Sequence, residues 1–69
     1  MNKDTLKGEW KELKGKVRQQ WGKLTDDDLQ QIQGDREILL GKLQKVYGRS
    51  REEAEKDYEH WLEGQRAKI

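Results

Sequence analysis

His60 is the only histidine of this 69-residue chain, and histidine is the side chain best suited to acid–base chemistry near neutral pH. A catalytic role would also require a nucleophile within hydrogen-bonding reach of the imidazole. The aliphatic hydroxyl groups are those of Ser50, Thr5 and Thr25. All three stand where a helix is expected to begin, which is typical of capping residues. We therefore interpret His60 as structural or exposed, and we predict that the protein has no catalytic residue and is not an enzyme.

Three consecutive acids, Asp26 to Asp28, are the strongest candidate for a metal site. Consecutive residues of a helix point about 100° apart, so their carboxylates do not converge on one ion. The spacing also differs from that of a calcium-binding loop. The chain contains no cysteine, which excludes thiolate ligands and disulfides. We predict no metal site and no cofactor.

Basic residues form a row with helical spacing near the N-terminus. They are Lys3, Lys7, Lys11, Lys14 and Arg18. Such a row could bind a nucleic-acid backbone, an anionic membrane surface or an acidic partner. Lys23 and Arg49 each follow a glycine in an expected turn, where backbone N–H groups could also bind phosphate. These seven basic residues define a hypothesis of weak, sequence-independent nucleic-acid binding.

Acidic residues weaken that hypothesis. Asp26 to Asp28 follow Lys23 closely, Glu52 and Glu53 follow Arg49, and the net charge of the chain is only +1. These acids would repel a phosphate at the same helix ends, where they also complement the helix dipole. We favour a solvated, internally balanced charged face and keep nucleic-acid binding as the alternative.

The apolar residues recur at spacings of three and four, which predicts four helices. The first apolar face consists of Leu6, Trp10, Leu13, Val17 and Trp21. A short second helix carries Leu29 and Ile32 up to about Gly34. The third begins near Asp35 and carries Ile38, Leu39, Leu40, Leu43, Val46 and Tyr47. The fourth carries Ala54, Tyr58, Trp61 and Leu62.

Capping residues and glycines mark the predicted helix ends. Thr25 with Asp28, and Ser50 with Glu53, have the spacing of capping boxes. Gly22 and Gly48 stand where a glycine often ends a helix. Two sets of three glycines each recur at intervals of seven: Gly8, Gly15 and Gly22, and again Gly34, Gly41 and Gly48. They could let a second backbone approach closely in a homo-oligomer, but we favour helix boundaries and tolerated solvent-facing positions.

A weak internal repeat relates the two halves of the chain. Shifting the sequence by 26 residues superposes identical residues at several positions, among them Gly8/Gly34, Leu13/Leu39, Gly15/Gly41, Lys16/Lys42 and Gly22/Gly48. We therefore predict an all-α fold of four helices, arranged as two packed helical hairpins related by this pseudo-repeat. Residues 1–69 are expected to form a single domain.

Composition places limits on location and stability. Charged residues make up 42% of the chain and hydrophobic residues 30%, so the core is small. No apolar run reaches the roughly 20 residues that span a bilayer, and the N-terminus lacks the apolar stretch of a signal peptide. We expect a cytoplasmic protein that is folded but only marginally stable.

Several short motifs, taken together, resemble the CsbD-like family of small bacterial stress-response proteins. They are NKD at 2–4, GEW at 8–10, GKV at 15–17, WGKLTDDDL at 21–29, GDR at 34–36 and GKLQKVYG at 41–48. The resemblance implies a compact four-helix fold of two hairpins, a bacterial cytoplasmic setting and induction in the general stress response. It implies no known reaction and assigns no binding residue. The tail GQRAKI at 64–69 matches none of these motifs.

The first hypothesis for function is therefore a non-enzymatic stress-response protein that acts by binding or by self-association. Its partner is unknown, and a second copy of the chain and a different protein both remain open. The alternative is the nucleic-acid backbone binder described above, whose affinity must fall steeply with salt.

Overall fold

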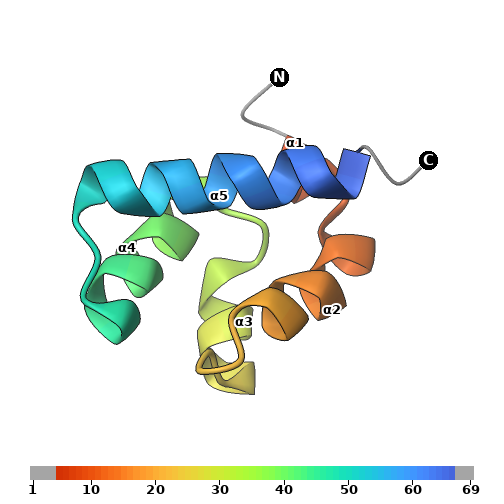
Figure 1. Ribbon diagram of the computed structural model, residues 1–69. Helices are drawn as coiled ribbons and strands as arrows, with labels where there is room; N and C mark the ends of the chain where they lie inside the picture. The colour runs from red at the N-terminus through yellow and green to blue at the C-terminus, as the bar shows by residue number, and fades with distance from the viewer. Residues whose placement is uncertain (1–4, 67–69) are drawn as a thin grey trace.

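The computed structural model describes the backbone of residues 5–66 and the side chains of residues 6–65. Over this range the chain forms five helices and no strand (Figure 1). They are α1 (Thr5–Gly8), α2 (Trp10–Gln20), α3 (Asp26–Ile32), α4 (Arg36–Tyr47) and α5 (Arg51–Arg66). The all-α class is confirmed. The first part of the tail GQRAKI continues α5 as far as Arg66.

The helix starts follow the predicted capping residues. Thr25 Oγ1 accepts from the Asp28 amide while the Asp28 carboxylate accepts from the Thr25 amide, which completes a capping box at α3. Ser50 and Glu53 make the same reciprocal bonds at α5, at 3.0 and 3.1 Å. Asp35 caps α4 by accepting from the amides of Glu37 and Ile38. These bonds satisfy backbone donors that a helix leaves unpaired at its start.

The prediction of one continuous first helix is wrong, because the helix breaks at Glu9. This residue has φ −114° and ψ 18°, and its carbonyl oxygen accepts from the Glu12 and Leu13 amides as α2 begins. Gly8, which ends α1, is a poor helix former. The break lets α1 turn its backbone against the loop that contains Gly34, to which Lys7 lies very close.

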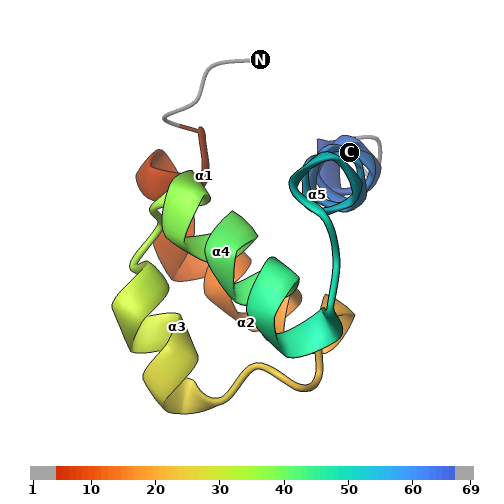
Figure 2. The same ribbon diagram turned by 90° about the vertical axis from the view of Figure 1, so that its left-hand side faces the viewer.

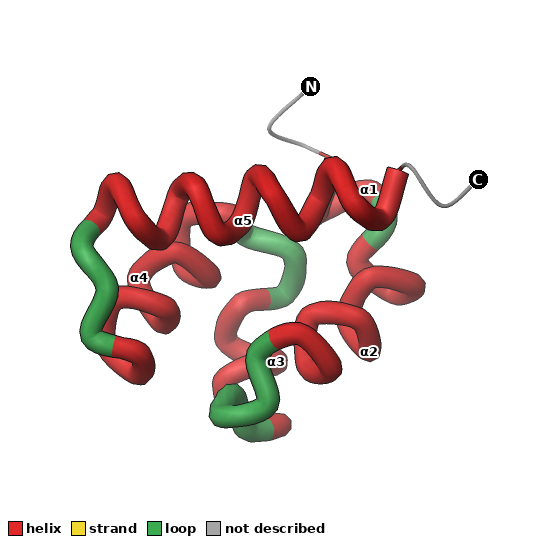
Figure 3. The backbone as a smooth tube through the Cα atoms, viewed as in Figure 1, coloured by secondary structure: helices red, strands yellow, loops and turns green. Residues whose placement is uncertain are grey.

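Helix α4 lies between α3 and α5 and contacts both extensively. Figure 1 shows α5 lying across one side of the other helices, and Figure 2 shows α5 and α3 on different sides of α4. The loops that connect α2 to α3 and α4 to α5 are visible in Figure 3. Helices α4 and α5, which were predicted to pair, pack against each other.

The arrangement as two packed hairpins is not confirmed, because α2 and α3 have few contacts with each other. Helix α3 has only seven residues, of which Leu29 and Ile32 are buried, and it packs on α4 instead. The pseudo-repeat is nevertheless visible in the helix bounds. Shifting α2 by 26 residues gives 36–46, which is nearly the range of α4 (Arg36–Tyr47).

The buried core draws on all five helices. It contains Leu6, Leu13, Val17, Trp21, Leu24, Leu29, Ile32, Leu39, Leu40, Leu43, Ala54, Tyr58, Trp61 and Leu62. Trp10, Val46 and Tyr47 are partly buried and pack against it. The Trp21 and Trp61 rings lie 5.3 Å apart and connect the end of α2 to α5.

Two details of the core differ from the prediction. Ile38 was predicted to face inward, but it is 39% exposed. At about 100° per residue, it falls outside the arc of α4 that Leu39, Leu40 and Leu43 occupy. Leu24 lies in the loop before α3 and is buried, although no helical period indicated it.

The glycines behave mainly as boundaries or as solvent-facing positions. Gly22, Gly34 and Gly48 lie between helices, while Gly15 and Gly41 are exposed within them. Gly34 and Gly48 have positive φ, of 81° and 65°. Gly22 follows Trp21, the C-cap of α2, and so marks a helix boundary as predicted, but it does not have a positive φ.

Candidate functional site

The predicted nucleic-acid-binding residues occupy two separate parts of the fold. Lys3 lies outside the described residues. We call Lys7, Lys11, Lys14 and Arg18 the basic stripe; all four are exposed on α1 and α2. Lys23 and Arg49 lie instead in the loops after α2 and α4.

The two glycine turns are occupied by contacts within the chain. The Lys23 amide donates to the Tyr47 hydroxyl at 3.1 Å, and Lys23 Nζ lies 5.5 Å from the centre of the Tyr47 ring. Arg49 makes ion pairs with Asp57 at 3.1 Å and with Glu53 at 3.6 Å. Tyr47 therefore links the Lys23 loop to the segment that leads into Arg49, a contact that sequence reasoning missed.

The residues of the basic stripe make fewer contacts within the chain than Lys23 and Arg49 do. Arg18 forms an ion pair with Asp26 of α3. Among the residues that the structure describes, Lys7, Lys11 and Lys14 have no carboxylate within 4.0 Å. In the described part of the chain, the predicted internal balance of this row is thus seen at Arg18, which pairs with an acid of α3, and no ion pair joins the row to Glu9 or Glu12.

The acids at Asp26 to Asp28 serve helix α3 rather than a common ligand. Asp28 forms an ion pair with Lys42 at 3.1 Å, and the Lys42 ammonium also donates to Gln31. The hydrogen bond from the Thr25 amide, followed by that from Lys42, lowers the pKa of Asp28. Over residues 5–66, no three His, Asp or Glu side chains lie close enough together to hold a metal ion.

The Glu53 carboxylate likewise accepts a capping hydrogen bond, at the start of α5. The hydrogen bond from the Ser50 amide holds the pKa of Glu53 below its ordinary value. On α5, Arg51 pairs with Glu37 at 2.8 Å, and this hydrogen bond raises the pKa of the guanidinium. Burial raises the pKa of Tyr58. Each of these shifts has a cause in capping, in a surface ion pair or in core packing.

The candidate catalytic groups are dispersed. His60 is exposed and lines a hollow of about 550 Å³ between the ends of α2 and α4 and the side of α5. Arg49 and Asp57, which pair with each other, line the same hollow. The Ser50 and Thr25 hydroxyls are instead used in the two capping boxes.

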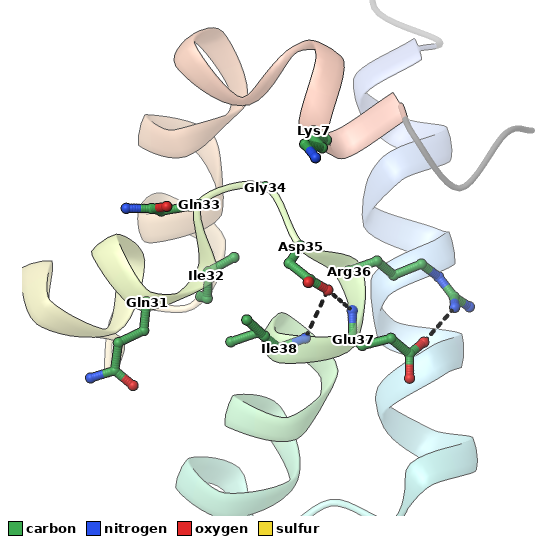
Figure 4. A pocket seen from close by; sticks show the side chains of 9 residues that line it. All are labelled: Lys7, Gln31, Ile32, Gln33, Gly34, Asp35, Arg36, Glu37 and Ile38. Atoms are coloured by element: carbon green, nitrogen blue, oxygen red, sulfur yellow. Dashed lines mark hydrogen bonds and ion pairs between the residues drawn. The ribbon is translucent and has the colours of Figure 1, made fainter.

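A second hollow, of about 420 Å³, is lined by the loop between α3 and α4 and by the adjoining helix ends (Figure 4). Asp35, Arg36 and Glu37 line it, and all three are already engaged. Asp35 caps α4, and Arg36 pairs with Glu37 at 3.2 Å and with Glu55 at 3.5 Å. Sequence reasoning missed Arg36, whose guanidinium also lies 5.6 Å from the centre of the Tyr58 ring. The Thr25 and Ser50 hydroxyls line neither hollow.

Comparison with known proteins bears on this arrangement. The CsbD-like family model matches residues 4–56, which include α1 to α4 and the first turn of α5. The chain belongs to the CsbD-like family. The predicted resemblance is thereby confirmed.

Relatives of this CsbD-like chain come from several bacteria. UPF0337 protein pc0632 of Protochlamydia amoebophila is 54% identical over 66 residues, which cover 96% of this chain and 100% of the relative. UPF0337 protein ECA0631 of Pectobacterium atrosepticum is 56% identical over 61 residues, or 88% of each chain. UPF0337 protein YjbJ of Escherichia coli (strain K12) is 54% identical over 61 residues, again 88% of each chain.

No solved structure matches this CsbD-like protein. None of the helices within residues 5–66 is both long and apolar enough to cross a membrane.

Proposed function

We propose that this CsbD-like protein is a bacterial stress-response protein that acts in the cytoplasm by binding rather than by catalysis. The proposal is supported by a difference among its polar side chains, because some are engaged within the molecule and others are not. The hydroxyls of Thr25 and Ser50 cap helices, whereas Lys7, Lys11 and Lys14 are exposed without a carboxylate within 4.0 Å in the described part of the chain. The groups left available for intermolecular contact are charged, and charged groups on rigid helices suit electrostatic binding.

A complementation experiment tests this proposal. An Escherichia coli strain lacking UPF0337 protein YjbJ would carry this chain or its variants, and survival would be counted after osmotic shock, heat and prolonged stationary phase. We expect the wild-type chain to restore survival and Lys11→Glu/Lys14→Glu to fail, because the charge of the basic stripe is reversed. Lys16→Glu/Lys45→Glu is the matched control, since it changes net charge equally at two exposed lysines outside the stripe. Equal survival with and without the chain under all three stresses would contradict the stress role.

The exposure of the basic stripe also favours the second candidate, a sequence-independent nucleic-acid binder. Its residues are Lys3, Lys7, Lys11, Lys14, Arg18, Lys23 and Arg49. If the stripe makes four phosphate contacts, raising the salt concentration from about 50 to about 200 mM should lower the affinity for duplex DNA by about 100-fold. Fluorescence anisotropy of a short labelled duplex measures this dependence. Lys11→Glu/Lys14→Glu should reduce the salt slope by about two, while Lys16→Glu/Lys45→Glu should not. Unchanged anisotropy at the lowest salt excludes this candidate.

A further inference from the structure

Helix α5 carries a negative counterpart to the basic stripe. Glu52, Glu59 and Glu63 are exposed, and their spacing of seven and four residues places them on one face. We call these three residues the acidic ridge. Within the described residues none of them has a basic group within 4.0 Å. Lys56 is exposed on the same face and offsets one of the three negative charges.

The other acids of α5 are already neutralised within the molecule. Glu53 and Asp57 pair with Arg49, and Glu55 pairs with Arg36 and Arg51. Glu55 and Asp57 are also half-buried, whereas the acidic ridge is exposed. The negative charge that α5 has available for another molecule is therefore concentrated on the ridge.

The stripe and the ridge face different sides of the molecule. Arg18 pairs with Asp26 of α3, and Lys7 lines the hollow formed by the end of α3 and the start of α4. The two ends of the stripe thus lie on the α3 side. Helix α4 separates α3 from α5, as Figure 2 shows. The stripe and the ridge are consequently placed to pair between copies and not within one copy.

From this arrangement we propose that the acidic ridge of one copy binds the basic stripe of a second copy. The inference rests on the proposed binding function and names the partner as another molecule of the same chain. Charge complementarity selects this partner, because each copy supplies both surfaces. Because the two surfaces lie on different sides of the molecule, the contact is head-to-tail, and it leaves a free ridge and a free stripe unless the copies close into a ring. Short chains of several copies should form, and not only a closed dimer.

Sedimentation velocity on the purified full chain tests the contact, from about 10 µM to about 1 mM protein. The screening length falls from about 30 Å at 0.01 M salt to about 8 Å at 0.15 M. We therefore expect species larger than a dimer at low salt, and an association constant at least about tenfold lower at 0.15 M.

Charge reversal on either surface should abolish association. The two variants are Lys11→Glu/Lys14→Glu on α2 and Glu59→Lys/Glu63→Lys on α5. All four substituted side chains are exposed and lie outside the core, so both variants should remain folded, as circular dichroism would verify. Lys16→Glu/Lys45→Glu, which matches the net charge of the first variant, should still associate.

The variant that carries all four reversals is the decisive one. It has the same net charge as the wild type, with the signs exchanged at Lys11 and Lys14 of the stripe and at Glu59 and Glu63 of the ridge. Association should return in this variant while both double variants stay monomeric, a result that net charge alone does not produce. If the wild type is monomeric at low salt, or if the fourfold variant stays monomeric, the head-to-tail contact is wrong. Complementation by a monomeric wild-type chain would leave the proposed stress function intact, so the two failures are distinguishable.

Discussion

Replacing Gly34 by alanine is expected to destabilise the protein by about 2 to 5 kcal/mol, because a positive φ and a close backbone contact act together. Gly34 has φ +81°, and a Cβ atom there would lie 2.7 Å from Lys7 Cα and 3.1 Å from Trp10 Cβ. The neighbouring backbone atom cannot move without displacing α1. A core of this size contributes about 3 to 5 kcal/mol of net stability, so much of the population should unfold. Urea denaturation followed by far-ultraviolet circular dichroism measures the change.

Two other glycines separate the causes. Gly48 has φ +65°, but a methyl group added there would meet open space, so Gly48→Ala should cost only about 1 to 2 kcal/mol. Gly15 lies within α2, also with open space, and Gly15→Ala should stabilise by up to about 1 kcal/mol. If Gly34→Ala costs no more than Gly48→Ala, the close approach of α1 to this loop does not contribute to stability.

Leu43→Ala should cost about 2 to 5 kcal/mol, enough to leave the chain largely unfolded. Leu43 is 1% exposed on α4, the helix that contacts both α3 and α5. Trp21→Ala, which removes the ring that packs 5.3 Å from Trp61, should cost about 3 to 5 kcal/mol. Thermal melts followed by tryptophan fluorescence for Leu43→Ala, and by circular dichroism for Trp21→Ala, measure both losses.

Ile38→Ala is the matched control for Leu43→Ala, since it removes an apolar side chain from the same helix at a 39% exposed position. Its cost should stay within about 0.5 kcal/mol. A cooperative melt of Leu43→Ala at the wild-type temperature would contradict the assignment of Leu43 to the core.

The features that the sequence predicted well are those set by neighbours along the chain. A capping box needs only two residues three positions apart, so Thr25 with Asp28 and Ser50 with Glu53 could be found without knowledge of the fold. The break at Glu9 could not, because the apolar period continues across it and its cause includes the loop around Gly34. Similarly, the packing of α3 on α4 depends on which helix offers an apolar face nearby.

The sequence predicted which basic residues form the candidate surface, but it did not predict which of them other side chains of the molecule engage. Helical spacing placed Lys7, Lys11 and Lys14 on one exposed face. The engagement of Arg49 by Asp57, and of Lys23 by Tyr47, depends on contacts between residues far apart in sequence or on different turns. The distinction between engaged and available charge therefore required the structure.

The order of helix contacts has a consequence for the speed of folding. The helix pairs in most extensive contact, α1 with α2, α3 with α4 and α4 with α5, are neighbours along the chain. Helical proteins whose contacts are mostly local fold within about microseconds to milliseconds, because little chain entropy is lost before a contact forms. The chain also contains no proline, which removes the slow isomerisation that delays many other proteins. A molecule with this topology can be marginally stable and still return to its native state almost at once after each unfolding event.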